Sequence, residues 1–274
     1  MQSRKQFIVT GLMALAFVSA QATGDAKKIV VDGSTTVGPI AKAFAEYYMK
    51  AHPDVNITVS ESGSGNGAKS LINGACDVAT MSREAKEKEC AAAKEKGRQF
   101  TEHIVAMDGI AAVVHPSNPV QGLTKEQLRG IYAGEITNWK QVGGPDLAIV
   151  VISRDTNSGT YECFQELVLK PARVTGSAEY VGSNGAVRQR IQSTPGAIGY
   201  VGLAFTEGVR PLIINNVEPT TDNVVAKTYP ISRALFMYTD GEPMAGTALA
   251  DFVNLCNTAD GKKLVGEQGY VPLK

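Results

Sequence analysis

The stretch from Leu147 to Leu169 constrains the fold of this chain more than any other. It begins with an apolar run, Leu147–Ile152, which has the length and composition of a strand buried on both faces. A polar turn containing one glycine follows, and helix-like residues begin at Glu162. A strand, a polar turn and the start of a helix bring backbone N–H groups toward one point, which is how many proteins hold an anion.

The side chains of this turn favour the same interpretation. Arg154 carries a planar guanidinium that can bind two oxygens at once, and Ser158 and Thr160 carry hydroxyl donors. A simpler interpretation is that Ser158 only caps the helix and Arg154 is a solvated surface charge. The turn alone leaves both interpretations open, so the rest of the chain has to decide between them.

Turns of the same kind recur along the chain. Polar, glycine-containing segments follow apolar strands around residues 33–36 and 63–67, and Ser82 ends a third short strand. The alternation of strands with helical segments predicts an α/β fold with largely parallel sheets. In such sheets the turns that follow the strands lie at one edge, where ligands bind. We therefore expect these turns and the 154–160 turn to converge on one small anion.

The overall charge excludes several classes of partner. The chain has 274 residues, enough for one large or two medium domains, and its 27 basic residues equal its 27 acidic residues. No net field attracts nucleic acid or an anionic membrane, and no basic run alternates with aromatic residues. We therefore expect no nucleic-acid partner.

The N-terminal segment has the pattern of a signal peptide. Arg4 and Lys5 precede a mostly apolar stretch, 7–20, and Ala20-Gln21-Ala22 fits a cleavage site with small residues. A retained membrane helix is the alternative, but the apolar run is short for a span. We expect a signal peptide over residues 1–22, no lipid anchor, and a periplasmic mature chain that starts near Thr23.

The cysteine pattern gives a prediction about disulfides. There are four cysteines, at 76, 90, 163 and 256, and no C-x-x-C pair, which disfavours a zinc or redox site. An even number in an exported chain is typical of disulfides. Cys76 and Cys90 could pair because they are close in sequence, and Cys163 and Cys256 could be buried and free.

Enzymatic chemistry finds little support. Gly63–Ser70 nearly matches the phosphate loop of nucleotide hydrolases, but Ala68 stands where the second glycine belongs. No G-x-S-x-G occurs, the three histidines lie outside the polar turns, and no ligand cluster has metal spacing. We expect no catalysis, no metal and no cofactor. Asp155 is expected to orient Arg154, and Trp139 to anchor packing.

Several motifs occur together in one order along the mature chain. They are Asp32-Gly-Ser-Thr-Thr-Val37, Gly63-Ser-Gly-Asn-Gly67, Asp77-Val-Ala-Thr-Met-Ser-Arg83, Leu123-x5-Gly130-Ile-Tyr-x-Gly134-x-Ile-x-Asn-Trp139, Arg154-x3-Ser-Gly-Thr160 and Gly196-Ala-Ile-Gly-Tyr200. With them the chain resembles the phosphate-binding proteins of bacterial phosphate ABC transporters, which have the class II periplasmic-binding-protein fold. The resemblance implies two α/β lobes joined by a hinge, each a largely parallel sheet flanked by helices. Lobe one would be 24–108 plus 228–274, and lobe two 109–227.

The resemblance also implies a function and a set of ligands. The chain would be a monomer that captures inorganic phosphate between its lobes and delivers it to a membrane permease. The phosphate ligands would be Thr35, Thr36, Ser64, Ser82, Arg154, Ser158, Gly159 and Thr160. Some family members carry an aspartate at the position of Ser82, where a buried acceptor can select protonated phosphate over sulfate. Another oxyanion, such as sulfate or a molybdate-like ion, is therefore an alternative ligand, and an exported phosphatase is a further alternative.

Overall fold

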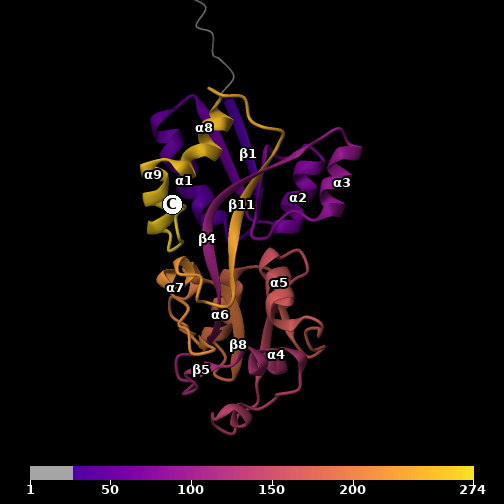
Figure 1. The fold of residues 1–274 in the computed structure, drawn as a ribbon, viewed down its shortest axis with the longest axis vertical. Helices are drawn as coiled ribbons and strands as arrows, with labels where there is room; N and C mark the ends of the chain where they lie inside the picture. The colour runs from indigo at the N-terminus through magenta and orange to yellow at the C-terminus, as the bar shows by residue number, and fades with distance from the viewer. Residues whose placement is uncertain (1–26) are drawn as a thin grey trace, which may run out of the picture.

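The structure is a computed structural model that describes residues 27–274. The predicted signal peptide, 1–22, and residues 23–26 lie outside this range. Figure 1 shows an elongated α/β molecule with two parts stacked along its long axis. The upper part contains both ends of the described chain, and the lower part is formed by its middle.

The upper part contains the first strands and helices and the last ones. Its N-terminal elements are β1 (Lys27–Gly33), α1 (Gly38–Ala51), β2 (Val55–Ser60), α2 (Ser64–Ile72), β3 (Val78–Met81) and α3 (Glu87–Glu95). Its C-terminal elements are α8 (Ala248–Asn254), the short helix η4 (Leu255–Asn257) and α9 (Ala259–Glu267). Two long strands, β4 (Phe100–Val114) and β11 (Ser232–Asp240), run from this part into the lower one (Figure 1).

The lower part alternates short strands with helices. Its strands are β5 (Gly122–Leu123), β6 (Val150–Arg154), β7 (Glu179–Val181), β8 (Ala197–Gly202), β9 (Arg210–Pro211) and β10 (Ile213–Ile214). Its helices are α4 (Lys125–Ala133), η1 (Trp139–Val142), α5 (Gly159–Phe164), η2 (Gln165–Leu169), α6 (Asn184–Gln192), η3 (Leu203–Phe205) and α7 (Thr221–Val225). Helix α4 begins at the predicted capping box, in which the Gln127 amide donates to Thr124 Oγ1.

The main strands form one hydrogen-bonded path in the order β2-β1-β3-β11-β4-β8-β6-β7. Pairing is parallel at both ends of the path and antiparallel around β4 and β11. Strand β4 pairs with β11 from Phe100 to Gly109 and with β8 from Ile110 to Val114, so it belongs to both parts. The sequence pattern indicates only the second half of β4, from Ile110, because the polar residues Thr101–His103 and then Asp108-Gly109 interrupt the apolar run in the first half.

The buried hydrophobic side chains form four groups, and the two largest lie above and below the middle of β4. One group combines β1, β2 and α1 with C-terminal residues such as Phe252 and Val265. The other lies between Ile110 and Ile231 with Val271, and includes Trp139. Trp139 is fully buried and its indole N–H donates to the Gly196 carbonyl at 2.9 Å, so it anchors packing as expected.

The structure corrects the predicted cysteine pair. All four cysteines are free: Cys76 and Cys256 are buried, Cys163 is half-buried, and Cys90 is exposed on α3. The pairing of Cys76 with Cys90 is therefore wrong, since closeness in sequence does not turn two side chains toward each other.

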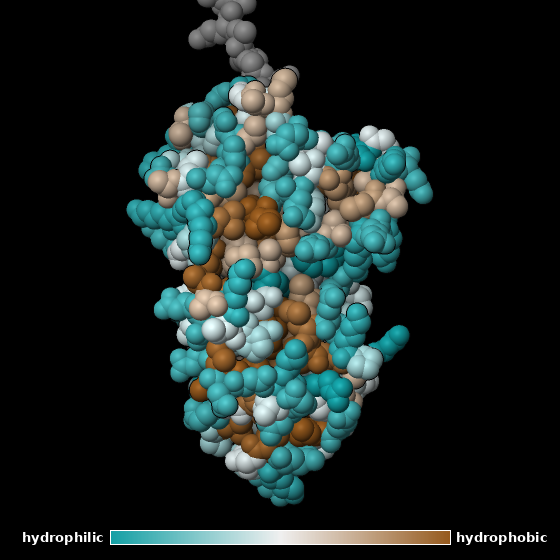
Figure 2. All heavy atoms as spheres, viewed as in Figure 1, coloured by the Kyte–Doolittle hydropathy of each residue, from teal (hydrophilic) through white to brown (hydrophobic). Residues whose placement is uncertain are grey.

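On the face in Figure 2, hydrophilic residues cover much of both parts, and patches of hydrophobic residues show among them in the upper part and in the lower part. No helix between residues 27 and 274 is long and apolar enough to cross a bilayer.

Candidate anion-binding site

The predicted turns meet where the two parts of the molecule face each other. In the upper part, residues 34–37 follow β1, Ser64 opens α2, and Ser82 follows β3. In the lower part, Arg154 ends β6 and Gly159 opens α5. Ser158 is the N-cap of α5, where its Oγ accepts from the Tyr161 amide at 3.2 Å. The capping role and a place in the site are therefore compatible.

Direct hydrogen bonds join the two sides. Thr36 Oγ1 lies 3.1 Å from Thr160 Oγ1, and Arg154 Nη2 donates to Thr35 Oγ1 at 3.4 Å. The Gly65 amide donates to the Asn157 carbonyl at 2.9 Å. These contacts join the upper and lower parts directly.

A close backbone approach brings in the serines of the upper side. A methyl group at Gly159 would come within 2.5 Å of Ser64 Oγ and 2.7 Å of Ser82 Oγ, so only glycine fits there. Ser64 Oγ accepts from the Ser82 amide at 3.0 Å, and the two serine oxygens are 3.3 Å apart. The structure thus brings all eight sequence-predicted site residues together, and every one of them is buried.

Arg154 is a buried cation whose guanidinium is only partly hydrogen-bonded. Its side chain donates to the carbonyls of Val181 and Gly182 and to Thr35, but its Nη1 has no partner among the described residues. No carboxylate of the described chain lies within 4 Å of it; Asp155, its expected partner, instead accepts from the Asn157 amide. Burial lowers the pKa of Arg154 to about 10, so it remains charged at neutral pH. A buried charge with a free donor is poised for an anion.

Asn184 is a site residue that the sequence reasoning missed. It opens α6 in the lower part, and its Nδ2 donates to Thr36 Oγ1 at 2.9 Å and to Thr35 Oγ1 at 3.1 Å in the upper part. The signal was present, since Ser183-Asn184-Gly185 also lies between a strand and a helix. A stricter use of the strand–turn–helix rule would have found it.

Arg233 and Asp108 form a second missed element. Arg233, on β11, donates to Thr160 Oγ1 at 3.0 Å and to the Ser82 carbonyl at 3.1 Å. It also pairs with the fully buried Asp108 of β4 at 3.0 Å. Burial raises the pKa of Asp108, and the arginine opposes that rise. A charged residue inside an apolar strand, such as Asp108, is the available sequence signal for such a pair.

Arg83 stands next to Ser82 in the sequence, but carboxylates of the protein pair with its guanidinium. Its Nη2 lies 2.7 Å from Glu89 Oε1 and its Nε lies 2.8 Å from Glu162 Oε2. Two carboxylates therefore balance this cation from within the protein. The arginines that hydrogen-bond the threonines of the candidate site are Arg154 and Arg233.

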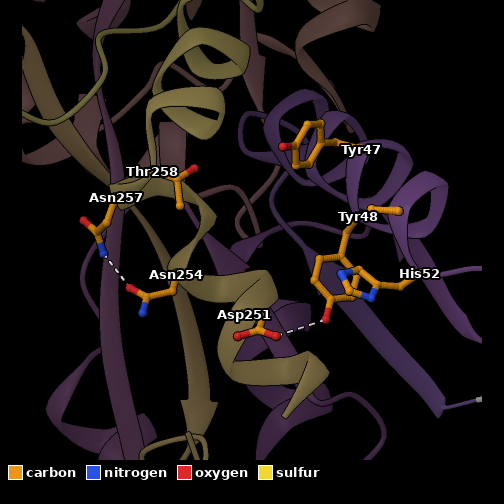
Figure 3. Close-up of a pocket in the computed structure, with 8 residues that line it drawn as sticks. Tyr47, Tyr48, His52, Asp251, Asn254, Asn257 and Thr258 are labelled. Carbon is orange, nitrogen blue, oxygen red and sulfur yellow. Dashed lines mark hydrogen bonds between the residues drawn. The ribbon is translucent and has the colours of Figure 1, made fainter. Parts of the chain in front are cut away.

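Another hollow of the surface has different chemistry. Figure 3 shows a pocket of about 430 Å³ between the end of α1 and the C-terminal helices. Tyr48 stacks on His52 there, and its hydroxyl donates to Asp251 at 3.3 Å. The side chains that line this pocket include no lysine or arginine, which disfavours an anion. Over residues 27–274, no group of histidine, cysteine and carboxylate side chains is arranged to hold a metal ion.

Comparison with known proteins identifies the family of this chain. A model of the PBP superfamily domain matches residues 18–255. The chain belongs to the PBP superfamily. A relative in Bacillus subtilis, the phosphate-binding protein PstS, is 35% identical over 262 residues, which cover 93% of this chain and 85% of that protein. The protein SphX of Synechococcus elongatus is 32% identical over 289 residues, which cover 98% and 86%. Within the superfamily the chain therefore belongs with the bacterial phosphate-binding proteins.

Solved structures of this family share the fold. The chain superposes with a TM-score of 0.84 on a Clostridium perfringens protein assigned as a phosphate ABC transporter substrate-binding protein, solved with bound phosphate. The two are 33% identical, and the alignment covers 90% of this chain and 100% of that one. An ABC-type phosphate transport receptor from Vibrio cholerae gives a TM-score of 0.72 at 33% identity, with 89% and 100% covered. The α/β fold predicted from the sequence, with its two facing parts, is confirmed as that of a PBP superfamily protein.

Proposed function

We propose that this protein captures inorganic phosphate in the cleft between its two parts and delivers it to the permease of a phosphate ABC transporter. The phosphate ligands are the hydroxyls and amides of Thr35, Thr36, Ser64, Ser82, Ser158, Gly159 and Thr160, together with the Arg154 guanidinium. The kinship with the phosphate-binding proteins supports this assignment.

One observation carries the proposal. Arg154 is 1% exposed, and its Nη1 points a hydrogen toward no acceptor in the described chain. Leaving a buried charged donor unmet is costly, so a ligand with an oxygen acceptor and a negative charge is its natural partner. Phosphate supplies both.

The two parts act as lobes that close on the anion. Lobe one comprises 24–108 plus 228–274, and lobe two comprises 109–227. The hydrophobic groups support the main part of this division, because the upper one has no buried member between Ala106 and Leu235, and most of the lower one lies between Ile110 and Val224. Tyr229, Ile231 and Val271 pack into the lower group from the C-terminal segment of lobe one. Strands β4 and β11 cross between them and form the hinge.

The site binds and releases its ligand without chemistry. Its side chains are hydroxyls, an amide, arginines and the arginine-paired Asp108. The three described histidines make their contacts elsewhere: His52 stacks on Tyr48, His103 bonds to Thr239 and His115 bonds to Ser117. A hydrolase needs a general base within reach of water or a nucleophile, and no free one faces the cleft in the described chain. The protein works outside the cytoplasm, after cleavage of a signal peptide at 1–22, as a monomer.

A titration tests the proposal. The mature chain, starting near Thr23, is freed of bound anion and titrated with phosphate by calorimetry. We expect micromolar or tighter binding, and stabilisation by roughly 4 kcal/mol when phosphate exceeds the Kd about 1,000-fold. Arsenate, which has the same shape and protonation, should compete. The proposal fails if phosphate gives neither heat nor a shift in Tm.

Two further measurements separate the neighbouring functions. A chromogenic phosphate ester should bind weakly and remain intact, whereas turnover that Arg154→Ala abolishes would mean an exported phosphatase. Deletion of the gene should slow growth when phosphate is scarce and leave growth unchanged when phosphate is abundant. Equal growth in both conditions would contradict the role in delivery to a permease.

A further inference from the structure

The C-terminal segment that follows α9 reaches the turn after β1. The Tyr270 hydroxyl donates to the Thr36 carbonyl at 2.5 Å, and the two residues are 234 positions apart in the sequence. Tyr270 is 2% exposed and belongs to the upper hydrophobic group. The last residues of the chain therefore contact the backbone of one side of the candidate site.

Thr36 carries several of the contacts between the two sides of the site. Its Oγ1 lies 3.1 Å from Thr160 Oγ1 and accepts from Asn184 Nδ2 at 2.9 Å. It also accepts from Arg233 Nη2 at 3.4 Å. Tyr270 bonds the carbonyl of this same residue, so the way in which the Thr36 backbone is held decides where its hydroxyl lies.

Few other bonds hold this turn to the rest of the protein. Ser34 Oγ accepts from the amides of Thr36 and Val37 at 3.1 and 3.4 Å, but these bonds lie within the turn. The Ser34 amide donates to the Thr80 carbonyl at 2.9 Å and joins the turn to β3. Helix α1 begins at Gly38 without a side-chain cap. Among residues 27–274, Tyr270 is the one side chain that donates a hydrogen bond to the backbone of residues 34–37.

The backbone on both sides of Tyr270 is fixed. Gly269 follows α9 in the left-handed conformation, with φ +81°, and the Tyr270 amide donates to the Val265 carbonyl at 3.2 Å. On the other side, Val271 and Met107 exchange two backbone hydrogen bonds of 2.9 and 3.0 Å. Met107 lies on β4, which crosses between the two parts. The phenol is therefore held in place before it bonds the turn.

The phenol remains a donor at physiological pH. Burial raises the pKa of Tyr270 well above its usual value, and Asp108 adds to the rise while Arg233 opposes it. A buried carbonyl is unfavourable without a hydrogen-bond partner. The phenol thus stabilises the backbone arrangement in which the Thr36 carbonyl is bonded to the C-terminal segment and the Thr36 hydroxyl is left to the site.

We infer that Tyr270 is a positioning residue for phosphate binding, whose hydroxyl holds the turn after β1 in the geometry that presents the Thr36 hydroxyl to the anion. This inference rests on the proposed function and adds a residue outside the set of ligands. Tyr270 acts through the backbone of Thr36. The alternative is a purely structural role, in which the phenol fills the core and satisfies one carbonyl.

Removal of one hydroxyl separates these two roles. Tyr270→Phe keeps the ring, and calorimetric titration should show phosphate bound roughly threefold to tenfold more weakly, the size expected for one hydrogen bond. Tyr229→Phe is the matched control, because Tyr229 is also 2% exposed and donates to a carbonyl outside the candidate site, that of Ile110, at 3.0 Å. Both variants should lower the Tm of the unliganded protein by a similar amount, but Tyr229→Phe should keep the Kd of wild type.

A double-mutant cycle tests whether Tyr270 acts through Thr36. Thr36→Val keeps the shape of the side chain and removes its hydroxyl. In this background Tyr270→Phe should cost little further affinity for phosphate, because the group that it positions is already absent. In a Ser158→Ala background, where the change lies in the lower part, Tyr270→Phe should weaken phosphate binding by the same factor as in wild type.

The outcomes distinguish the inference from the function. If phosphate does not bind the wild-type protein, the proposed function itself fails. If wild type binds phosphate and Tyr270→Phe binds it as tightly, the function stands and the inference is overturned. Equal losses of affinity in Tyr270→Phe and Tyr229→Phe also overturn it, as does an undiminished loss in the Thr36→Val background.

A second pair of variants decides the question if Tyr270→Phe does not fold. Gly269→Ala strains the backbone that leads into Tyr270, because φ there is +81°. Gly246→Ala is its control, since Gly246 has φ +78° and open space around it. Gly269→Ala should weaken phosphate binding and Gly246→Ala should not, and equal affinities would overturn the inference.

Discussion

Arg83 and Arg154 are two buried arginines that follow strands, and their surroundings are opposite. Arg83 makes two hydrogen bonds of 2.8 and 2.7 Å to Glu89, and its Nε lies 2.8 Å from Glu162. Arg154 is more deeply buried, yet its side chain hydrogen-bonds only to carbonyls and to the hydroxyl of Thr35, and its Nη1 has no hydrogen-bond partner in the described chain.

The difference separates a structural arginine from the one that we propose binds the ligand. A buried cation that has carboxylate partners is neutralised within the protein and needs no ligand. A buried cation without such partners weakens the unliganded protein, and an anion that supplies the missing charge binds it strongly. Burial alone therefore does not mark a binding residue, whereas burial without compensation does.

Arg233 has features of both. It is balanced by Asp108, like Arg83, and it donates to the cleft hydroxyls of Thr36 and Thr160, like Arg154. The three arginines thus form a graded series, and substituting each by methionine separates stability from binding. Methionine is suitable because it preserves much of the length of the side chain without its charge.

Arg233→Met should have the largest effect on stability. It leaves Asp108 as a buried carboxylate without its partner, and breaking a buried pair in this way costs about 3–5 kcal/mol. Urea denaturation of the unliganded protein measures the loss, and phosphate titration should also show weaker binding. Combining it with Asp108→Asn should restore much of the stability and little of the affinity. If Arg233→Met alone is as stable as wild type, this account of the Arg233–Asp108 pair is refuted.

Arg154→Met should have the largest effect on binding alone. Removing one partner of a desolvated charge pair costs about 2–5 kcal/mol, which is roughly 30-fold to several thousand-fold in Kd. The unliganded protein should be as stable as wild type or more so, because an uncompensated buried charge is gone. Calorimetric titration and thermal unfolding without phosphate measure the two quantities. If the variant is less stable without phosphate but binds phosphate as tightly as wild type, Arg154 is a structural residue and not a binding one.

Arg83→Met should lower the stability of the protein and leave phosphate binding unchanged, and the loss of stability should be smaller than that of Arg233→Met. Glu89 and Glu162 remain partly reached by water, and Lys86 lies 2.5 Å from Glu162, so the loss of unfolding free energy is about 1–3 kcal/mol. The Kd for phosphate should stay close to that of wild type. Parallel titrations of Arg83→Met and Arg154→Met measure the contrast, and equal losses of affinity would erase the distinction between the two residues.

The sequence predicts the local parts of this site better than the parts that depend on tertiary packing. Ser158, Gly159 and Thr160 follow a strand and open a helix, and this geometry is set within a few residues. The partners of Arg83 and Arg154 come from other elements, so no local pattern distinguishes the paired arginine from the unpaired one. For the same reason the expected partnership between Arg154 and Asp155 does not form, since Asp155 closes its own turn.

The long crossing strands show the same limit for the fold. Alternation of strands and helices predicts the α/β class, but Arg233 lies within β11 and Asp108 within β4, far from any turn. Their pairing follows from the register between these strands, in which Arg233 is opposite Asp108. Such a register is a tertiary property, which is why both residues were missed.

Glu89→Gln should have the smallest effect on the free energy of unfolding. It tests the Arg83–Glu89 pair by removing the charge of the carboxylate. Burial opposes ionisation of Glu89, but hydrogen bonds from Arg83 and the Lys86 amide outweigh it, so the pKa of Glu89 is lowered. A carboxyl whose pKa is lower in the folded state stabilises the protein above its unfolded value of about 4.3, and this contribution is lost as pH falls through the folded value. The free energy of unfolding of wild type should therefore exceed that of Glu89→Gln by up to about 1 kcal/mol near pH 7, and this difference should close toward pH 3.

Denaturation at a series of pH values measures the difference in unfolding free energy, and Glu87→Gln, on the same helix, is the control that should show none. A gap that stays constant with pH would mean that Glu89 acts through packing and not as the charge partner of Arg83.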